Sequence, residues 1–351
     1  MINRIHGGNC LKRNIVDFSV NTNPLGLPEG LTDIISKNAD CICRYPDPSS
    51  EILKRKLSIL HGVAPENIAI GNGSIELIYL VPRAFKIKKT LIITPTFSEY
   101  EFSVRSNGSM PVFFNTSEKN NFKIDCGNLA VRLERCDAFL CNPNNPTGAL
   151  LHSDEVVYLS RHAKKHKRFL ILDEAFIEFS EQAKSKTVIS EAVKNRSLVI
   201  LRSLTKFFAI PGLRLGYVIG HKSMIERIVK LQYPWNVNGM AQLAGERILA
   251  DKVYMDRTRL FVAKERQYMF ERLSSIRGLK VYPSSANFIL CKLQSAQIKS
   301  SIELTRRLLR EGVYIRDCEN FRGLNDKFFR VAVRKRDDND RLIKSIGKVF
   351  R

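Results

Sequence analysis

The sequence predicts an α/β protein with two unequal lobes, and three observations lead to this fold class. The 351 residues are more than a single hydrophobic core usually holds. Short apolar runs alternate with helical stretches up to about residue 240, and the pattern changes after that point. A mostly parallel sheet flanked by helices, followed by a smaller α+β lobe, accounts for all three.

The first lobe is predicted from apolar runs that have the length of buried strands and are followed by turns and helical patterns. They occupy residues 67–70, 90–94, 138–141, 169–173, 198–202 and 216–220. The second lobe begins with a charged helical stretch over residues 242–275, followed by "ANFILCKL", a helix and "FFRVAV". Because ligands bind at the carboxyl ends of the strands in an open α/β sheet, we expect the functional residues there.

Composition predicts a soluble cytoplasmic protein without a membrane partner. The chain is 44% hydrophobic and 26% charged. It has no apolar run of about 18 residues, and its polar start "MINRIHGGNC" does not have the apolar core of a signal peptide. The eight cysteines are scattered without a CxxC pair, so we expect reduced thiols rather than disulfides or a zinc ribbon.

The formal net charge of +22 raises the alternative of a nucleic-acid-binding protein. The excess is spread in short pieces such as "KIKK", "KKHKR" and "RKR", without aromatic residues at a stacking spacing. We therefore expect no nucleic-acid partner and interpret the charge as a basic surface that helps to draw in anionic substrates.

The first distinctive strand end is "GNGSIE", residues 71–76. Its glycines free the backbone, and its serine opens a helix, so the amides of Gly73, Ser74 and Ile75 are candidates for binding a phosphate. The segment does not contain the third glycine of GxGxxG, and an ordinary strand-to-helix turn would have a similar sequence.

Two further strand ends carry an amide and a carboxylate. In "NPNNPTG", residues 142–148, Asn145 can donate a hydrogen bond from a rigid loop. In "LILDEAF", Asp173 ends an apolar strand, where a charged carboxylate is costly unless a cation faces it. A helix cap or a salt bridge is the structural alternative for Asp173.

The fourth segment, "RSLTKFFAIPGLRLG", places a lysine among apolar residues. These neighbours are expected to lower the pKa of Lys206 and to favour a nucleophilic neutral amine. Ser203 and Arg214, on either side of it, are suited to bind a phosphate. A lysine that forms a Schiff base, an aspartate for a pyridine nitrogen and a phosphate cup are what a pyridoxal 5'-phosphate (PLP) enzyme requires of its protein.

The chain resembles PLP enzymes of the aspartate-aminotransferase fold (fold type I), in particular the threonine-phosphate decarboxylases of cobalamin synthesis and the related histidinol-phosphate aminotransferases. The resemblance spans nearly the whole chain. It rests on "HGGN", "DFSVNTNPLG", "RYPD", "GNGSIE", "PNNPTG", "LDEAFIEF", "RSLTKFFAIPGLRLGY", "PWNVN" and "FFRVAVR". It implies a mostly parallel seven-stranded sheet in a large PLP-binding domain, residues 38–240. The small C-terminal domain would be 241–351, with 1–37 as an N-terminal arm and part of the small domain.

The resemblance also implies a role for each matching residue in binding PLP. Lys206 would carry the cofactor, Asp173 would pair with its pyridine nitrogen, and Asn145 would bond its 3'-oxygen. Phe97 would lie on the ring face. The cofactor phosphate would be held by Gly73, Ser74, Ile75, Ser203 and Arg214. In this family a tyrosine, here Tyr45, reaches across a homodimer interface to the neighbouring cofactor phosphate.

For the substrate, the resemblance places Arg330 and Asn145 at the amino-acid end and His6 with Arg316 at the distal phosphate. Two arginines and a histidine suit a doubly anionic phospho-amino acid. Aminotransferase relatives usually have tyrosine where this chain has Phe176, whereas the decarboxylases share phenylalanine. This favours a lyase that decarboxylates O-phospho-L-threonine, or O-phospho-L-serine, which differs by one methyl group. Histidinol-phosphate transamination remains the alternative.

No metal site is predicted. His162 and His166 stand four residues apart, a spacing that places two side chains on one helix face, but "HAKKH" does not contain the glutamate of HExxH. We interpret the segment as a solvated helix face.

Overall fold

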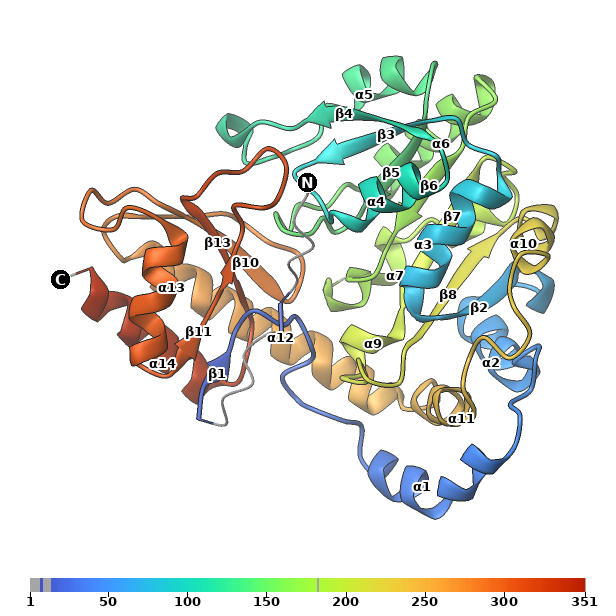
Figure 1. Ribbon diagram of the computed structural model, residues 1–351, viewed down its shortest axis with the longest axis horizontal. Coiled ribbons are helices and arrows are strands. Elements are labelled where there is room, and N and C mark those ends of the chain that lie inside the picture. Colours follow the sequence, from blue (N-terminus) through green and yellow to red (C-terminus); the bar gives the residue numbers. More distant parts are fainter. Residues whose placement is uncertain (1–6, 9–13, 182, 351) are drawn as a thin grey trace.

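The larger lobe is built on a seven-stranded sheet with the order β2-β8-β7-β6-β5-β3-β4 (Figure 1). The structure, a computed structural model, describes residues 7, 8, 14–181 and 183–350. The strands are β2 (Ile68–Asn72), β3 (Lys89–Thr94), β4 (Met110–Asn115), β5 (Asp137–Cys141), β6 (Leu170–Asp173), β7 (Leu198–Ser203) and β8 (Leu215–Gly220). Strand β8 runs antiparallel to both of its neighbours, β2 and β7, and the other neighbouring strands of this sheet pair in parallel. The predicted mostly parallel sheet is confirmed.

Apart from the edge strand β4, the strands of this sheet are buried on both faces, and alternate residues pack into two separate cores. In β6, Ile171 packs on one face and Leu170 and Leu172 on the other. The first face is covered by α3 (Gly73–Ala84), α4 (Glu99–Ser106) and α10 (Lys222–Val229). The opposite face is covered by α2 (Glu51–His61), α5 (Cys126–Leu133), α6 (Ser153–Lys165), α8 (Ile189–Ala192) and α11 (Gly239–Ile248). This double burial explains why the strands are continuous apolar runs in the sequence.

The smaller lobe contains an antiparallel sheet with the order β12-β13-β10-β9. Its strands are β9 (Leu279–Val281), β10 (Phe288–Leu293), β12 (Arg316–Asp317) and β13 (Phe328–Ala332), and its helices are α13 (Ser301–Arg310) and α14 (Arg336–Val349). Near the start of the chain, β1 (Val16–Asp17) pairs in parallel with β11 (Val313–Tyr314). The N-terminal segment therefore lies against the small lobe before it continues into the large one (Figure 1).

Short helical elements complete the chain between these parts. They are α1 (Leu31–Lys37), α7 (Ala183–Lys186), α9 (Leu204–Phe207), and the 3-10 helices η1 (Ala39–Cys43), η2 (Pro65–Asn67), η3 (Glu118–Asn120) and η4 (Ile177–Phe179). None of the helices in the described part of the chain has the length and apolar character needed to cross a bilayer.

Two details differ from the sequence-based prediction. The helical stretch expected over residues 242–275 is two helices, α11 and α12 (Lys252–Ser274), because Asp251 caps the second one by accepting a hydrogen bond of 2.9 Å from the Tyr254 amide. Strand β4 was not among the predicted apolar runs. It lies at the edge of the sheet, is only partly buried and contains Pro111, so its sequence pattern is weak. The domain limits at residues 37 and 240 remain a prediction.

Candidate active site

A cavity of about 610 Å³ lies between the lobes, beside the carboxyl ends of β6 and β7. Asp173 and Ser203, the last residues of these strands, line it, and so do Arg316 and Arg330 from the small-lobe strands β12 and β13. The predicted residues that line the cavity are Gly73, Ser74, Ile75, Phe97, Asn145, Asp173, Phe176, Ser203, Lys206, Arg214, Arg316 and Arg330. Segments far apart in the sequence thus converge on one site.

Among the described residues, Tyr45 is the one predicted site residue that does not line the cavity. His6 lies outside the described residues. Tyr45 is 81% exposed on the surface of the single chain, where its ring lies 4.6 Å from that of Trp235, measured between centroids. An exposed tyrosine packed on a tryptophan is available for contact with another protein surface.

The first residues of helix α3 form one wall of the cavity. Gly73 has φ of +74°, and a Cβ on it would lie 2.9 Å from Nη2 of Arg214. A Cβ on Gly216, in β8, would lie 2.3 Å from the Ser74 amide nitrogen. Both glycines therefore leave space around the helix N-terminus and the arginine. Exposed amides at a helix N-terminus, together with a guanidinium, attract an anion such as a phosphate.

Asp173 is a buried carboxylate, 3% exposed, at the end of β6. Its Oδ2 accepts a hydrogen bond of 2.7 Å from the Tyr100 hydroxyl, and its Oδ1 accepts one of 2.9 Å from the Ala175 amide. Burial raises the pKa of Asp173, and these two hydrogen bonds act in the opposite direction. A cationic partner in the cavity would stabilise the charged form.

Lys206 lies in α9, where the chain turns after β7. Burial, followed by the charges of Arg214 and Arg330, lowers the pKa of Lys206 to about 8. Its backbone is held in place, since the Lys206 carbonyl accepts a hydrogen bond of 2.9 Å from the Asn23 amide. A substantial fraction of this amine is therefore neutral near pH 8, as a nucleophile requires. The lowered pKa expected from the apolar sequence context is found.

Asn145 and Arg330 connect the two lobes at the cavity. Nη1 of Arg330 donates a hydrogen bond to Oδ1 of Asn145, and Nη2 donates one of 3.0 Å to the Ser19 carbonyl. The loop carrying Asn145 is held by Asn144, whose Nδ2 donates to the Pro95 carbonyl at 2.8 Å. The Asn145 oxygen is thus engaged by Arg330, which leaves its amide nitrogen as the donor available to a ligand.

Arg316 and Arg330 face each other across neighbouring strands, as partners in the register of β12 and β13. Both are buried, at 6% and 5% exposure. Nη2 of Arg316 donates a hydrogen bond of 2.8 Å to Oδ1 of Asn320. Burial lowers the pKa of Arg330 to about 10, and the nearby Arg316 charge adds to this effect. Two buried guanidiniums in one cavity call for anionic ligands.

Sequence reasoning missed several residues that line this cavity, among them Tyr100, Asn21 and Asn320. Tyr100 had a usable signal, because it follows Phe97 by three residues and the two rings meet edge to face with centroids 5.7 Å apart. Asn21 lies within the quoted "DFSVNTNPLG", but nothing in that stretch distinguishes it from its neighbours. Asn320 accepts a hydrogen bond from Arg316, a contact that the sequence around it does not indicate.

A buried ion-pair network lies behind the two strand ends. Arg202 precedes Ser203 in the sequence, and Glu174 follows Asp173. Nη2 of Arg202 lies 2.7 Å from Oε2 of Glu174. Arg202 also pairs with Glu178 at 2.8 Å, and Glu178 pairs with Arg259 at 2.5 Å. The side chains of Arg202 and Glu174 are 3% and 0% exposed. This pair connects β6 and β7 directly beneath the residues that enter the cavity.

These residues fit PLP. An amine with a lowered pKa suits the cofactor aldehyde, a buried carboxylate suits a protonated pyridine nitrogen, and the open helix N-terminus with Arg214 suits a phosphate. The cavity volume also exceeds that of the cofactor and leaves room for a small substrate.

Known proteins match the chain over most of its length. The family described as "Aminotransferase class I and II" matches residues 13–346. The threonine-phosphate decarboxylase of Salmonella typhimurium is 35% identical, covering 100% of this chain and 98% of that protein. The structure of histidinol-phosphate aminotransferase from Clostridium acetobutylicum has a TM-score of 0.88 at 33% identity, with 95% and 98% of the chains covered. The structure of L-threonine-O-3-phosphate decarboxylase from Porphyromonas gingivalis has a TM-score of 0.84 at 28% sequence identity. The match covers 95% of this chain and 99% of that one.

The sequence matches and the structural matches both cover nearly the whole chain and agree on its family. The chain belongs to the aminotransferase class I and II family of PLP-dependent enzymes.

Proposed function

We propose that this enzyme is a lyase that removes the carboxylate of an O-phospho-L-amino acid. The proposed substrate is O-phospho-L-threonine, and the products are carbon dioxide and 1-aminopropan-2-yl phosphate, a step of cobalamin synthesis. The observation that carries the proposal is the pair of buried arginines, Arg316 and Arg330, in the same cavity as Lys206 and Asp173. This arrangement offers separate cationic anchors for two anionic groups of one small substrate.

In this proposal the residues on the large-lobe side hold the cofactor. The Lys206 amine binds it, Asp173 holds a proton on its pyridine nitrogen, and Phe97 packs against its ring. The cofactor phosphate occupies the helix N-terminus at Gly73, Ser74 and Ile75, with Ser203 and Arg214 beside it. When bound, PLP supplies an electron sink for the pair released from a bond at the substrate Cα.

The substrate side of the proposal rests on the two arginines. Arg330 and the Asn145 amide nitrogen would bind the amino-acid carboxylate, and Arg316, together with His6, would bind the distal phosphate. The buried location of both arginines strengthens each contact, because water screens it less. Their fixed spacing would orient the substrate in the cavity, and this orientation would select which bond at Cα is cleaved.

Phe176 supports decarboxylation over transamination. It is buried at 6% exposure and packs edge to face on Phe288, with centroids 5.0 Å apart. A phenyl ring offers the 3'-oxygen no hydrogen-bond donor. The cofactor would then have Asn145 as its donor at that oxygen.

Histidinol-phosphate transamination is the second candidate, favoured by the likeness to the Clostridium acetobutylicum aminotransferase. Histidinol phosphate has no carboxylate, so product analysis separates the two reactions. The enzyme should convert O-phospho-L-threonine to 1-aminopropan-2-yl phosphate, identified by phosphorus and proton NMR. O-phospho-L-serine, with one methyl group fewer, should react with kcat/KM lower by roughly 10- to 200-fold. A nucleic-acid-binding protein, the remaining class of alternative, would show no visible absorbance from PLP.

We also propose a homodimer in which Tyr45 reaches the cofactor phosphate of the neighbouring subunit. Tyr45 is 81% exposed, and Ile42, close to it in the chain, is 75% exposed, as expected of surface that a second copy covers. Mixing subunits tests the exchange. Lys206→Ala and Tyr45→Ala homodimers should each be impaired, whereas their hybrids contain one complete site and should regain about a quarter of the wild-type activity on random mixing. Hybrids no more active than the parents would contradict the shared site.

The proposed compartment is the cytoplasm. The seven cysteines in the described part of the chain are all free thiols, in keeping with a reducing environment.

A further inference from the structure

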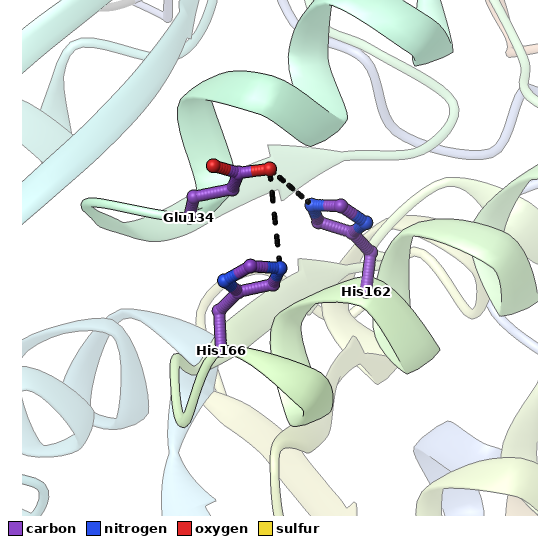
Figure 2. A group of neighbouring side chains, drawn as sticks. All are labelled: Glu134, His162 and His166. Carbon is purple, nitrogen blue, oxygen red and sulfur yellow. Dashed lines mark ion pairs between the residues drawn. The ribbon is translucent and has the colours of Figure 1, made fainter.

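Outside the cavity, three metal-ligating side chains converge on the surface of the large lobe (Figure 2). His162 lies in the last turn of α6, and His166 is the residue that caps the C-terminal end of this helix. Glu134 caps the C-terminal end of α5, 28 residues before His162 in the sequence. The packing of α5 against α6 brings the carboxylate to the two imidazoles. The histidine pair alone gave no reason to expect a third ligand.

The distances between these groups suit a single bound ion. Oε1 of Glu134 lies 3.5 Å from Nε2 of His162 and 3.9 Å from Nε2 of His166. All three ligand atoms lie within 4.8 Å of one another. A tetrahedral zinc ion with ligands at about 2.0–2.1 Å places them roughly 3.3–3.4 Å apart. Rotation of the side chains, without movement of the backbone, would therefore bring the three atoms to these distances around one ion.

A second observation indicates that the described protein atoms do not satisfy every polar atom of this cluster. Nε2 of His162 is buried and has no hydrogen-bond partner among the described residues. Its 3.5 Å contact with the Glu134 carboxylate does not meet hydrogen-bond geometry, although it is well placed for two ligands of one ion. The imidazoles stack with centroids 4.6 Å apart and an interplanar angle of 28°, and Nε2 of each faces the same Glu134 carboxylate oxygen. Because a metal is bound in the plane of an imidazole ring, binding of one ion requires the two rings to rotate out of this stack.

The backbone holds these ligands in place. Two histidines four residues apart project from neighbouring turns at the end of one helix. The Glu134 carbonyl accepts a hydrogen bond of 3.2 Å from Nε of Arg168, which fixes the segment carrying the carboxylate. The ligand set is therefore largely arranged before an ion arrives, which reduces the entropy lost on binding.

We propose that Glu134, His162 and His166 bind one divalent transition-metal ion, of which Zn²⁺ best suits two imidazoles and a carboxylate, with water completing the coordination. The ion would join the ends of α5 and α6 and stabilise the large lobe. The neighbouring basic residues of "KKHKR" repel a dication, so we expect micromolar rather than nanomolar affinity.

The test is calorimetric titration of Zn²⁺ into the chelator-treated holoenzyme, with its cofactor fixed to the protein by borohydride reduction so that PLP cannot exchange. One equivalent per chain should bind. His162→Gln, His166→Gln and Glu134→Gln should each weaken binding by roughly tenfold or more. The matched control is Cys41→Ser/Cys43→Ser, which removes the thiols at Cys41 and Cys43, the first partly and the second fully exposed, and should retain the full equivalent.

A second measurement covers variants that fold poorly. Zn²⁺ should raise the Tm of the wild-type holoenzyme, by mass action on the folded state, and should leave the Tm of His162→Gln/His166→Gln unchanged. Circular dichroism and the cofactor absorbance establish that this variant is folded. Loss of the equivalent in the cysteine control, or equal Zn²⁺ affinity in the wild type and the double histidine variant, would overturn the proposal.

Discussion

The Tyr100 hydroxyl donates a hydrogen bond of 2.7 Å to Oδ2 of Asp173, and both side chains are buried. Burial, together with the Asp173 charge, raises the pKa of Tyr100 well above its ordinary value, so the phenol keeps its proton and remains a donor. The same bond opposes the rise in the pKa of Asp173 that burial causes. Tyr100 therefore favours the charged carboxylate, the form needed opposite a protonated pyridine nitrogen.

Replacement of these two residues should affect catalysis to different degrees. Asp173→Asn keeps the size of the side chain and removes its charge, so kcat should fall by about 100-fold or more with little loss of folding stability. Tyr100→Phe leaves the carboxylate in place with one donor fewer and should reduce kcat by roughly tenfold. Steady-state kinetics at saturating PLP measures both. Near-normal turnover of Asp173→Asn with bound PLP would mean that another group holds the pyridine proton.

Capture of PLP by the apoenzyme should depend on pH through Lys206. The pKa of this amine is lowered to about 8, and only the neutral form attacks an aldehyde. The capture rate should therefore fall about tenfold for each pH unit below 8 and level off above it. Stopped-flow absorbance between pH 6.5 and 9.5 gives the profile, and Lys206→Ala should show no capture at this site and no turnover. A capture rate that still rises about tenfold per pH unit up to pH 9.5, as an amine with the ordinary lysine pKa requires, would contradict the effect of burial.

The ion pair behind the site predicts an asymmetric effect on stability. Arg202→Met leaves the buried Glu174 carboxylate without its cation and should lower the free energy of unfolding by about 3–5 kcal/mol. The double variant Arg202→Met/Glu174→Gln removes both charges of the pair, so it should lower the free energy of unfolding by less than Arg202→Met alone. Urea denaturation measures each value. The control is the exposed ion pair between Arg44 and Asp40, whose charged atoms lie 3.1 Å apart. Arg44→Met should change the free energy of unfolding by less than about 1 kcal/mol.

In the proposed site, Phe176→Tyr would add a hydroxyl close to the cofactor 3'-oxygen. A new donor there favours the deprotonated oxygen, so the pH titration of the cofactor's visible absorbance should move to lower pH. Some abortive transamination, detected as pyridoxamine phosphate, should accompany the change. A titration identical to that of the wild type would place Phe176 away from that oxygen.

The sheet and part of the site could be predicted from sequence for a common physical reason. Strands buried on both faces are continuous apolar runs, so a charged residue at the end of one, such as Asp173, stands out. Lys206 stands out equally among its apolar neighbours. Arg316 and Arg330 do not, since the chain has 57 lysines and arginines. Only the family resemblance directed attention to these two.

What escaped prediction depends on contacts between distant segments. The sequence around His162 does not predict a contact with Glu134, because the packing of α5 against α6 brings these residues together. The Arg202–Glu174 pair likewise joins neighbouring strands whose residues are far apart in the chain. The contact proposed for Tyr45 involves a second subunit, which the folded single chain does not contain.

The most direct test of the central claim is carbon dioxide release from O-phospho-L-threonine by the holoenzyme without any keto acid. A decarboxylase leaves its cofactor as the aldehyde and continues to turn over, whereas an aminotransferase stops after the first half-reaction, with its cofactor as pyridoxamine phosphate. We expect sustained release of carbon dioxide, and no sustained reaction of histidinol phosphate under the same conditions. Rapid conversion of histidinol phosphate once 2-oxoglutarate is added, with no carbon dioxide from either phospho-amino acid, would contradict the account.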